Sequence, residues 1–254
     1  MQLSDKSVWA KRAAKLGPAG VLLWKFKTMA LLVLTKGKLV LLGLTKLSTF
    51  ASMMAFFAVY WSLYGWKFAL GFVLSIYIHE MGHVIALRKY GIAATSPMFI
   101  PFVGAIVRLR QYPANVAQDA RVGLAGPIWG LGAAVVAWMA ALTTGLPIWY
   151  AIAHTGAWLN LFNLIPVWQL DGGRGFRALT RKQRGMALGV VVAMWVLTQE
   201  GMLLFIGLGA GYRLFTKDAP SEDDNGVLMQ YAGLIVLLAL LVLMTSRFSL
   251  RSSY

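Results

Sequence analysis

The stretch from Ile76 to Leu87, IYIHEMGHVIAL, carries the residues best suited to chemistry. His79, Glu80 and His83 form the pattern H-E-x-x-H, and residues four apart on a helix lie one above the other on the same face. The two imidazoles can therefore hold one metal ion, with the Glu80 carboxylate beside them. The chain has only three histidines, and two of them belong to this pattern.

A catalytic zinc site needs a third protein ligand, because zinc in such sites binds three side chains and keeps one position for water. No His, Asp or Glu occurs between His83 and Asp119. The candidates for the third ligand are therefore Asp119, His154, Asp171 and Glu200. Choosing among them requires the arrangement of the elements that carry them.

Composition indicates that these elements are membrane-spanning helices. Of the 254 residues, 59% are hydrophobic, and apolar runs approach the roughly 18–20 residues that a bilayer crossing needs. The net charge is +15, but the basic residues flank apolar runs, which favours membrane lipid over nucleic acid as their partner. The chain has no cysteine, which excludes disulfides and thiolate metal ligands.

We predict an all-α polytopic membrane protein with about six spans and a short membrane-associated β hairpin between the second and third. A basic amphipathic segment at 1–46 is expected to lie on the inner membrane surface, with a solvated basic arm as the alternative for residues 1–16. The catalytic membrane core is predicted at 47–213, followed by an acidic outer loop at 214–226. The last helix and a short basic tail occupy 227–254. The predicted spans of the core are 47–66, 68–87, 122–144, 147–170 and 185–211.

The distribution of lysine and arginine predicts the orientation, because these residues concentrate in cytoplasmic loops. With the first residue inside, the predicted outer loops hold only Lys67, Arg213 and Lys217, and the acidic residues of 214–226 also face out. We therefore predict that both termini are cytoplasmic. The absence of organellar signals favours a prokaryotic plasma membrane.

This orientation selects Asp171 as the third ligand. The second and fourth spans both run inward, so the histidines and Asp171 all lie near the inner edge. His154 falls near the outer end of the fourth span, and Glu200 lies about 24 Å up the fifth. Asp119 sits among basic loop residues and is expected to be a solvated charge or a helix cap. The alternative for Asp171 is a helix-end carboxylate that simply pairs with Arg174.

The loop between the second and third spans is apolar but too short to cross. Its segment Pro97–Arg110 is rich in Val, Ile and Phe and is broken by proline and glycine, which predicts short strands. Irregular apolar backbone near a membrane must be buried in protein or line a cavity, so we expect a hairpin close to the metal face. Phe99, Val103 and Gly104 are the predicted substrate contacts. The alternative is a peripheral loop.

Two motifs together resemble the site-2 protease family, the intramembrane zinc metalloproteases of the M50 type. The first is His-Glu-Met-Gly-His at 79–83, and the second is N-x-x-P-x-x-x-L-D-G, which runs here from Asn163 to Gly172. The resemblance implies one zinc ion per chain on His79, His83 and Asp171. It further implies Glu80 as the base and cleavage of peptide bonds inside transmembrane helices.

The chain resembles a compact form of this family, because no loop has room for a PDZ or CBS domain. Gly130 stands where family members often have asparagine. The Asn163 amide is predicted to help stabilise the oxyanion of the reaction. The competing hypotheses are a membrane metal transporter and a non-catalytic protease-like scaffold. The expected partners are a transmembrane protein or peptide substrate and lipid, whereas the oligomeric state is not predicted.

Overall fold

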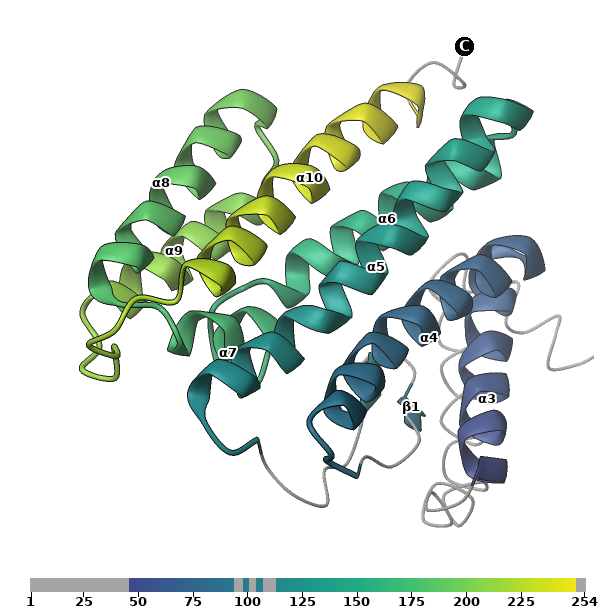
Figure 1. Ribbon diagram of the computed structural model, residues 1–254. Helices are drawn as coiled ribbons and strands as arrows, with labels where there is room; N and C mark the ends of the chain where they lie inside the picture. Colours follow the sequence, from purple (N-terminus) through teal and green to yellow (C-terminus); the bar gives the residue numbers. More distant parts are fainter. Residues whose placement is uncertain (1–45, 94–97, 101–103, 107–112, 250–254) are drawn as a thin grey trace, which may run out of the picture.

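The structure is a computed structural model that describes residues 46–93, 98–100, 104–106 and 113–249, which form a bundle of helices with one small sheet (Figure 1). Almost all of the predicted basic segment 1–46, and Val103, lie outside the described residues. Among the described helices, three are long and apolar enough to cross a membrane. They cover Trp66–Lys89, Val116–Thr144 and Asn225–Ser246.

The first two helices that the structure describes form a hairpin in place of the predicted segments 47–66 and 68–87. Helix α3 spans Lys46–Tyr64 and α4 spans Trp66–Lys89, and they are joined by Gly65, whose φ of 86° is one that glycine adopts without strain. Aromatic rings hold the two helices together, with Tyr60 and Phe72 at a centroid distance of 4.8 Å. Helix α4 carries the H-E-x-x-H pattern toward its C-terminal end.

The small sheet consists of β1 (Met98–Ile100) and β2 (Gly104–Ile106), which pair antiparallel with Phe99 opposite Ala105. The Phe99 side chain is only 2% exposed and packs near Phe56 and Tyr77, in the core between α3 and α4. Its backbone N–H donates to the Ser52 hydroxyl of α3. The Phe99 side chain thus packs within the helix pair, and its contact with a substrate stays a prediction.

Helices α5 and α6 lie beside α4 (Figure 1). Helix α5 spans Val116–Thr144, and α6 spans Pro147–Asn163. The predicted span 147–170 is too long, because the helix ends at Asn163 and Pro166 cannot supply the backbone N–H that a continued helix needs. The chain then turns into the short helix α7, Asp171–Arg177.

The predicted single span 185–211 is wrong, because it comprises two antiparallel helices. Helix α8 spans Arg181–Thr198 and α9 spans Met202–Leu214, and they lie side by side (Figure 1). Between them Gln199 adopts a left-handed backbone with φ of 54°. Glu200 lies in this turn and its carboxylate accepts the Met202 N–H at 3.2 Å. It therefore caps α9, whereas a bond to another helix in mid-span was expected.

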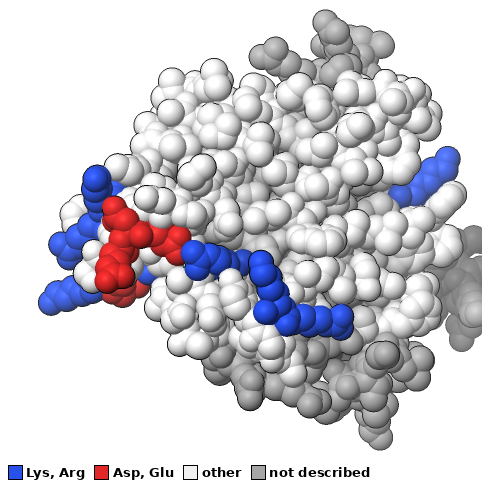
Figure 2. Space-filling model, in the orientation of Figure 1, with Lys and Arg blue, Asp and Glu red and all other residues white. Residues whose placement is uncertain are grey.

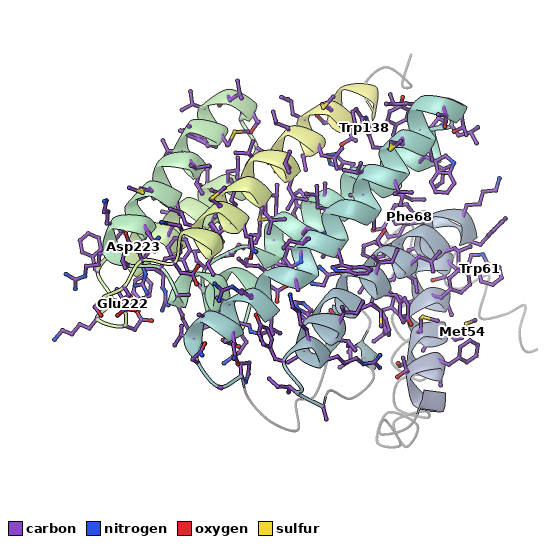
Figure 3. All side chains as sticks on the ribbon, in the orientation of Figure 1. Met54, Trp61, Phe68, Trp138, Glu222 and Asp223 are labelled. Carbon is purple, nitrogen blue, oxygen red and sulfur yellow. The ribbon has the colours of Figure 1, made fainter. Side chains whose placement is uncertain are left out.

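The split of this span changes the side on which the acidic segment lies. Asp218 pairs with Arg184 at 3.1 Å, Asp224 pairs with Arg121 at 2.8 Å, and the Thr180 hydroxyl donates to Asp223. The segment thus meets the starts of α5 and α8, and charged side chains gather at this end of the molecule (Figures 2 and 3). Its predicted position on the opposite side is wrong.

The last helix, α10, spans Asn225–Ser249 and runs away from this charged end (Figure 1). Near its far end the Thr245 hydroxyl lies 3.0 Å from Nδ1 of His154, which belongs to the first half of α6. Helix α10 therefore ends opposite Arg121 and Arg184, although its tail was predicted to share their side.

Candidate metal centre

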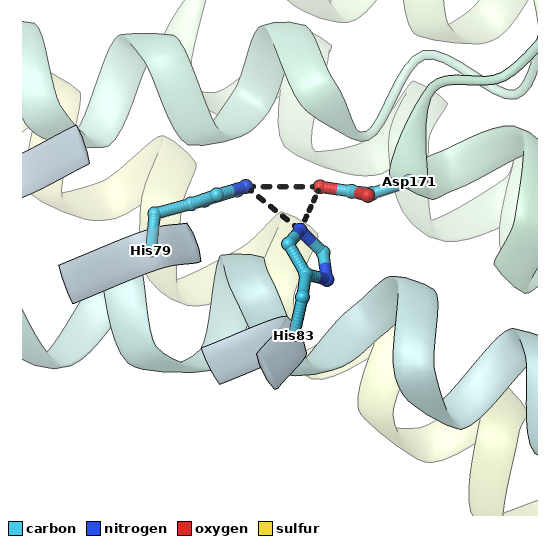
Figure 4. A group of neighbouring side chains, drawn as sticks. All are labelled: His79, His83 and Asp171. Atoms are coloured by element: carbon cyan, nitrogen blue, oxygen red, sulfur yellow. Dashed lines mark hydrogen bonds and ion pairs between the residues drawn. The ribbon is translucent and has the colours of Figure 1, made fainter. Parts of the chain in front are cut away.

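Three buried side chains from two helices point toward one another inside the bundle (Figure 4). The Nε2 atoms of His79 and His83, on α4, lie 3.2 Å apart. Asp171, the first residue of α7, places Oδ2 3.1 Å from Nε2 of His79 and 3.3 Å from Nε2 of His83. All three residues are buried. The structure thus brings together the three residues that the sequence analysis selected.

The other ring nitrogen of each histidine faces an oxygen. Nδ1 of His83 lies 2.8 Å from the backbone carbonyl of Val122, and Nδ1 of His79 lies 2.8 Å from Oδ1 of Asn160. Because these oxygens accept hydrogen bonds, each Nδ1 carries a proton. Both Nε2 atoms face the Asp171 carboxylate, which is the arrangement that metal-binding histidines adopt.

This donor set fits a metal ion. Ligand atoms bound at about 2.0–2.2 Å around a tetrahedral ion lie about 3.3–3.6 Å apart, close to the 3.1–3.3 Å separations here. Two imidazole nitrogens and a carboxylate this close together need a positive charge between them, which a metal ion or a proton on Nε2 can supply. A Cβ added at Gly126 of α5 would collide with Nε2 of His83 and lie 2.7 Å from Nε2 of His79. Glycine at 126 therefore leaves room for an ion.

Glycines let the helix backbones approach closely enough to build this centre. On α5 they occupy one face at 123, 126 and 130, and on α4 a Cβ at Gly82 would lie 2.5 Å from the carbonyl oxygen of Ala125. A Cβ at Gly123 would lie 2.8 Å from Cβ of Arg174. The sequence analysis did not assign these glycines to the site. Their helical spacing was the available signal, because small residues on one face permit close packing of helices.

Two further glycines and a tyrosine place Asp171. A Cβ at Gly172 would collide with the carbonyl of Leu164, and one at Gly173 would lie 2.8 Å from the Val167 carbonyl oxygen. Helix α7 therefore packs directly against the backbone that leads into it. From α10 the buried Tyr231 hydroxyl donates to the Leu164 carbonyl at 2.8 Å. The position of Asp171 is thus set by close packing of the α7 backbone against the segment that precedes it.

The other candidate ligands lie outside the cluster. Asp119 accepts two hydrogen bonds from Arg174, at 3.0 and 2.8 Å, so it ties α5 to α7. Arg174 is therefore engaged by Asp119, and the alternative of a simple Asp171–arginine pair is not favoured. His154 contacts Thr245 near the other end of the bundle, and Glu200 caps α9.

Two predicted catalytic residues lie on the helices that form the centre. Glu80 is adjacent to His79 on α4, is 8% exposed, and interacts electrostatically with both histidines and Asp171. Asn163 is the last residue of α6 and is half-buried. The asparagine that contacts a histidine is instead Asn160, one turn earlier.

The sequence is similar to known metalloproteases. It matches the family described as Peptidase family M50 over residues 67–146 and 143–207, which include every residue of the centre. A zinc metalloprotease of Methanocaldococcus jannaschii is 30% identical over 141 residues, which are 54% of this chain and 40% of that protein. Rip3 of Mycobacterium tuberculosis is 30% identical over 204 residues, which are 70% of this chain and 51% of that protein.

The chain thus spans about half or less of the length of these relatives. Among solved structures, the site-2 protease from Methanocaldococcus jannaschii is 20% identical, with a TM-score of 0.39. That match covers 68% of this chain and 93% of the solved chain.

Proposed function

This chain belongs to peptidase family M50, and from that premise we propose that it is a zinc-dependent endopeptidase that cleaves membrane proteins within or next to their transmembrane helices. The observation that carries the proposal is the convergence of His79, His83 and Asp171, whose donor atoms lie 3.1–3.3 Å apart in the buried middle of the bundle. Apolar helices around the centre suit a substrate that arrives from the membrane.

The mechanism assigns a task to each polar side chain at the centre. His79, His83 and Asp171 would hold the zinc ion, which when bound would act as a Lewis acid and lower the pKa of water. The Glu80 carboxylate accepts a proton from the attacking water and passes it to the leaving nitrogen of the peptide. The Asn163 amide donates a hydrogen bond to the developing oxyanion. Burial of Glu80 keeps bulk water away from this proton transfer.

The substrate must present an unwound segment, because a helix hides its peptide bonds. Unpaired backbone in lipid costs several kcal/mol per group, and added strand pairing can offset that cost. The outer edge of β1 faces α3 through the Phe99–Ser52 hydrogen bond, so β2 with Gly104 is the strand that offers an edge. We therefore expect substrates with Gly, Pro or Asn near the cut. Cleavage that survives replacement of these residues by leucine would contradict this part of the proposal.

The proposed orientation of the chain in the membrane rests on the distribution of Lys and Arg, taken with the acidic segment and the end of α10 on the sides described above. We take Arg121, Arg184 and the basic residues near them as the cytoplasmic end. The end of α4 lies there because Leu87 packs against Val122 of α5, and α3 starts beside the end of α4 because the two helices form a hairpin. Helix α10 then ends on the outer face. The plasma membrane of a prokaryote remains the proposed location, and tagging the C-terminus for protease accessibility in membrane vesicles tests the orientation.

Metal content tests the site directly. Elemental mass spectrometry of the detergent-purified chain should find about one zinc ion per wild-type chain and little in Asp171→Ala, since zinc needs three protein ligands. Asp119→Ala is the matched control, because Asp119 pairs with Arg174 and should leave zinc content unchanged. Synthetic transmembrane peptides then report cleavage. Equal zinc in wild type and Asp171→Ala would refute the ligand set.

A further inference from the structure

The two histidines of the centre are oriented by different kinds of oxygen. His83 faces the Val122 carbonyl, which belongs to the backbone and is present whatever the side chain at 122. His79 faces the side-chain amide of Asn160. An amide has an accepting end and a donating end, so its orientation decides which nitrogen of His79 carries the proton.

The orientation of the Asn160 amide is fixed by its second hydrogen bond. Nδ2 of Asn160 donates to the carbonyl of Gly156, one turn earlier on α6, at 2.7 Å. A carbonyl only accepts, so the donating end faces Gly156 and Oδ1 must face His79. Asn160 is only 3% exposed, which leaves no room for water to replace it. The Nδ1 proton of His79 is thereby held, and its Nε2 lone pair is directed at the other two ligands.

The Asn160 side chain lies beside α5 in the space left because Gly130 has no side chain. A Cβ added at Gly130 would collide with both carboxamide heteroatoms of Asn160 and lie 2.6 Å from its Cγ. Any larger residue at 130 would therefore displace the amide from His79. Gly130 and Asn160 form one unit, in which the glycine of one helix makes the space for the amide of another.

We propose that Asn160 is a positioning residue for metal binding by His79, that Gly130 is its socket, and that the amide can be supplied from either position. The carboxamide oxygen of an asparagine lies about 2.4 Å from its own Cβ. An asparagine at 130 could therefore bring its oxygen into the same small volume once the side chain at 160 is removed. The inference rests on the proposed zinc site.

The zinc dissociation constant of the full chain in detergent, measured by competition with a chromogenic chelator, tests the first part. Asn160→Leu keeps roughly the size of the side chain but removes both hydrogen bonds. We expect zinc affinity to fall about 10–100-fold, the effect of losing an outer-shell partner of a ligand. The matched control is Asn163→Leu, which should leave zinc affinity unchanged. The absorption spectrum of the cobalt-loaded protein should change in Asn160→Leu alone, because a tilted His79 alters the ligand geometry.

The exchange of the two residues tests the second part. Asn160→Gly alone should bind zinc weakly, and Asn160→Gly combined with Gly130→Asn should regain most of the lost affinity. Wild-type affinity in Asn160→Leu, or no gain in the double variant over Asn160→Gly, would overturn the proposal. None of these measurements needs a substrate. A wild-type chain that binds zinc and cleaves nothing would therefore refute the proposed function and leave this inference standing.

Discussion

The candidate metal centre and the charged end of the bundle bring ionisable groups together by opposite means. We call that end the base; it contains the ion pairs Arg184–Asp218 and Arg121–Asp224. At the centre, backbones approach through glycine, and the Asp171 side chain is only 11% exposed. At the base, long arginine side chains reach across to aspartates. Arg184 is fully buried there, whereas its partner Asp218 has a side chain that is 42% exposed.

The difference teaches where substitutions should act. Closely packed backbones leave no space for an added atom, so a substitution that adds a Cβ between the helices at the centre should sharply weaken metal binding by steric collision. Long side chains at the edge of the bundle can adjust, and water screens part of their interaction. Changes at the base should therefore act gradually, and on stability rather than on metal binding.

The largest expected effect comes from Gly126→Ala, which places a methyl group against Nε2 of both histidines. We expect zinc affinity to fall by more than about 100-fold, the upper end of what losing an outer-shell partner costs, with loss of all turnover. Gly132→Ala is the matched control, because a Cβ at 132 on the same helix meets no atom within 4 Å. Zinc titration of both variants makes the comparison. Tight zinc binding by Gly126→Ala would mean that the centre is not sterically closed.

Glu80→Gln should separate chemistry from metal binding at the centre. The substitution keeps shape and burial but removes the proton acceptor, so we expect turnover to fall about 10²–10⁴-fold while zinc content stays unchanged. Glu222→Gln, at an exposed residue of the base, should alter neither. Peptide cleavage and metal analysis report the two properties. Metal flux into vesicles that survives Glu80→Gln would favour the transporter hypothesis.

Arg184→Met should affect stability without affecting zinc. Its guanidinium donates to the carbonyls of Phe176 and Arg213, and leaving buried acceptors unpaired costs about 1–3 kcal/mol. The control is Arg181→Met, an exposed arginine one turn earlier on α8. Thermal unfolding in detergent measures the loss. If folded Arg184→Met also lost zinc, the stability of the base and metal binding at the centre would not be independent.

The smallest expected effect is the acid dependence of the base. Burial by itself would raise the pKa of Asp218, but hydrogen bonds from Thr216 and Arg184 and the charge of Arg213 hold the pKa below its usual value. This carboxylate therefore stabilises the fold above its unfolded pKa of about 4 and stops doing so as the pH falls through its folded pKa. The difference in Tm between wild type and Asp218→Asn should shrink in acid. A Tm difference that grows below pH 4 would mean that folding raises the pKa of Asp218, contrary to this prediction.

The predicted fold was accurate where local pattern governs and wrong where a turn interrupts an apolar run. The predicted segments 47–66, 68–87 and 122–144 overlap α3, α4 and α5, because glycine and charge delimit them. The run 185–211 was predicted to be one helix, since Gln199 and Glu200 alone mark a turn that could equally be two polar residues inside a span. Whether 185–211 is one helix or two determines on which side of the membrane the acidic segment and the C-terminal tail are predicted to lie.

The sequence by itself determined the candidate ligands, because H-E-x-x-H fixes two imidazoles on one helical face and few other ionisable groups lie within the apolar runs. It also placed Asp171 among them, since the second and fourth spans run in the same direction. Only the tertiary structure decided how the ligands are held. Residues distant in sequence meet at each of these points: Asn160 contacts His79, the Val122 carbonyl contacts His83, and Gly126 leaves space beside both histidines. No local pattern encodes such contacts, because they depend on how closely whole helices pack.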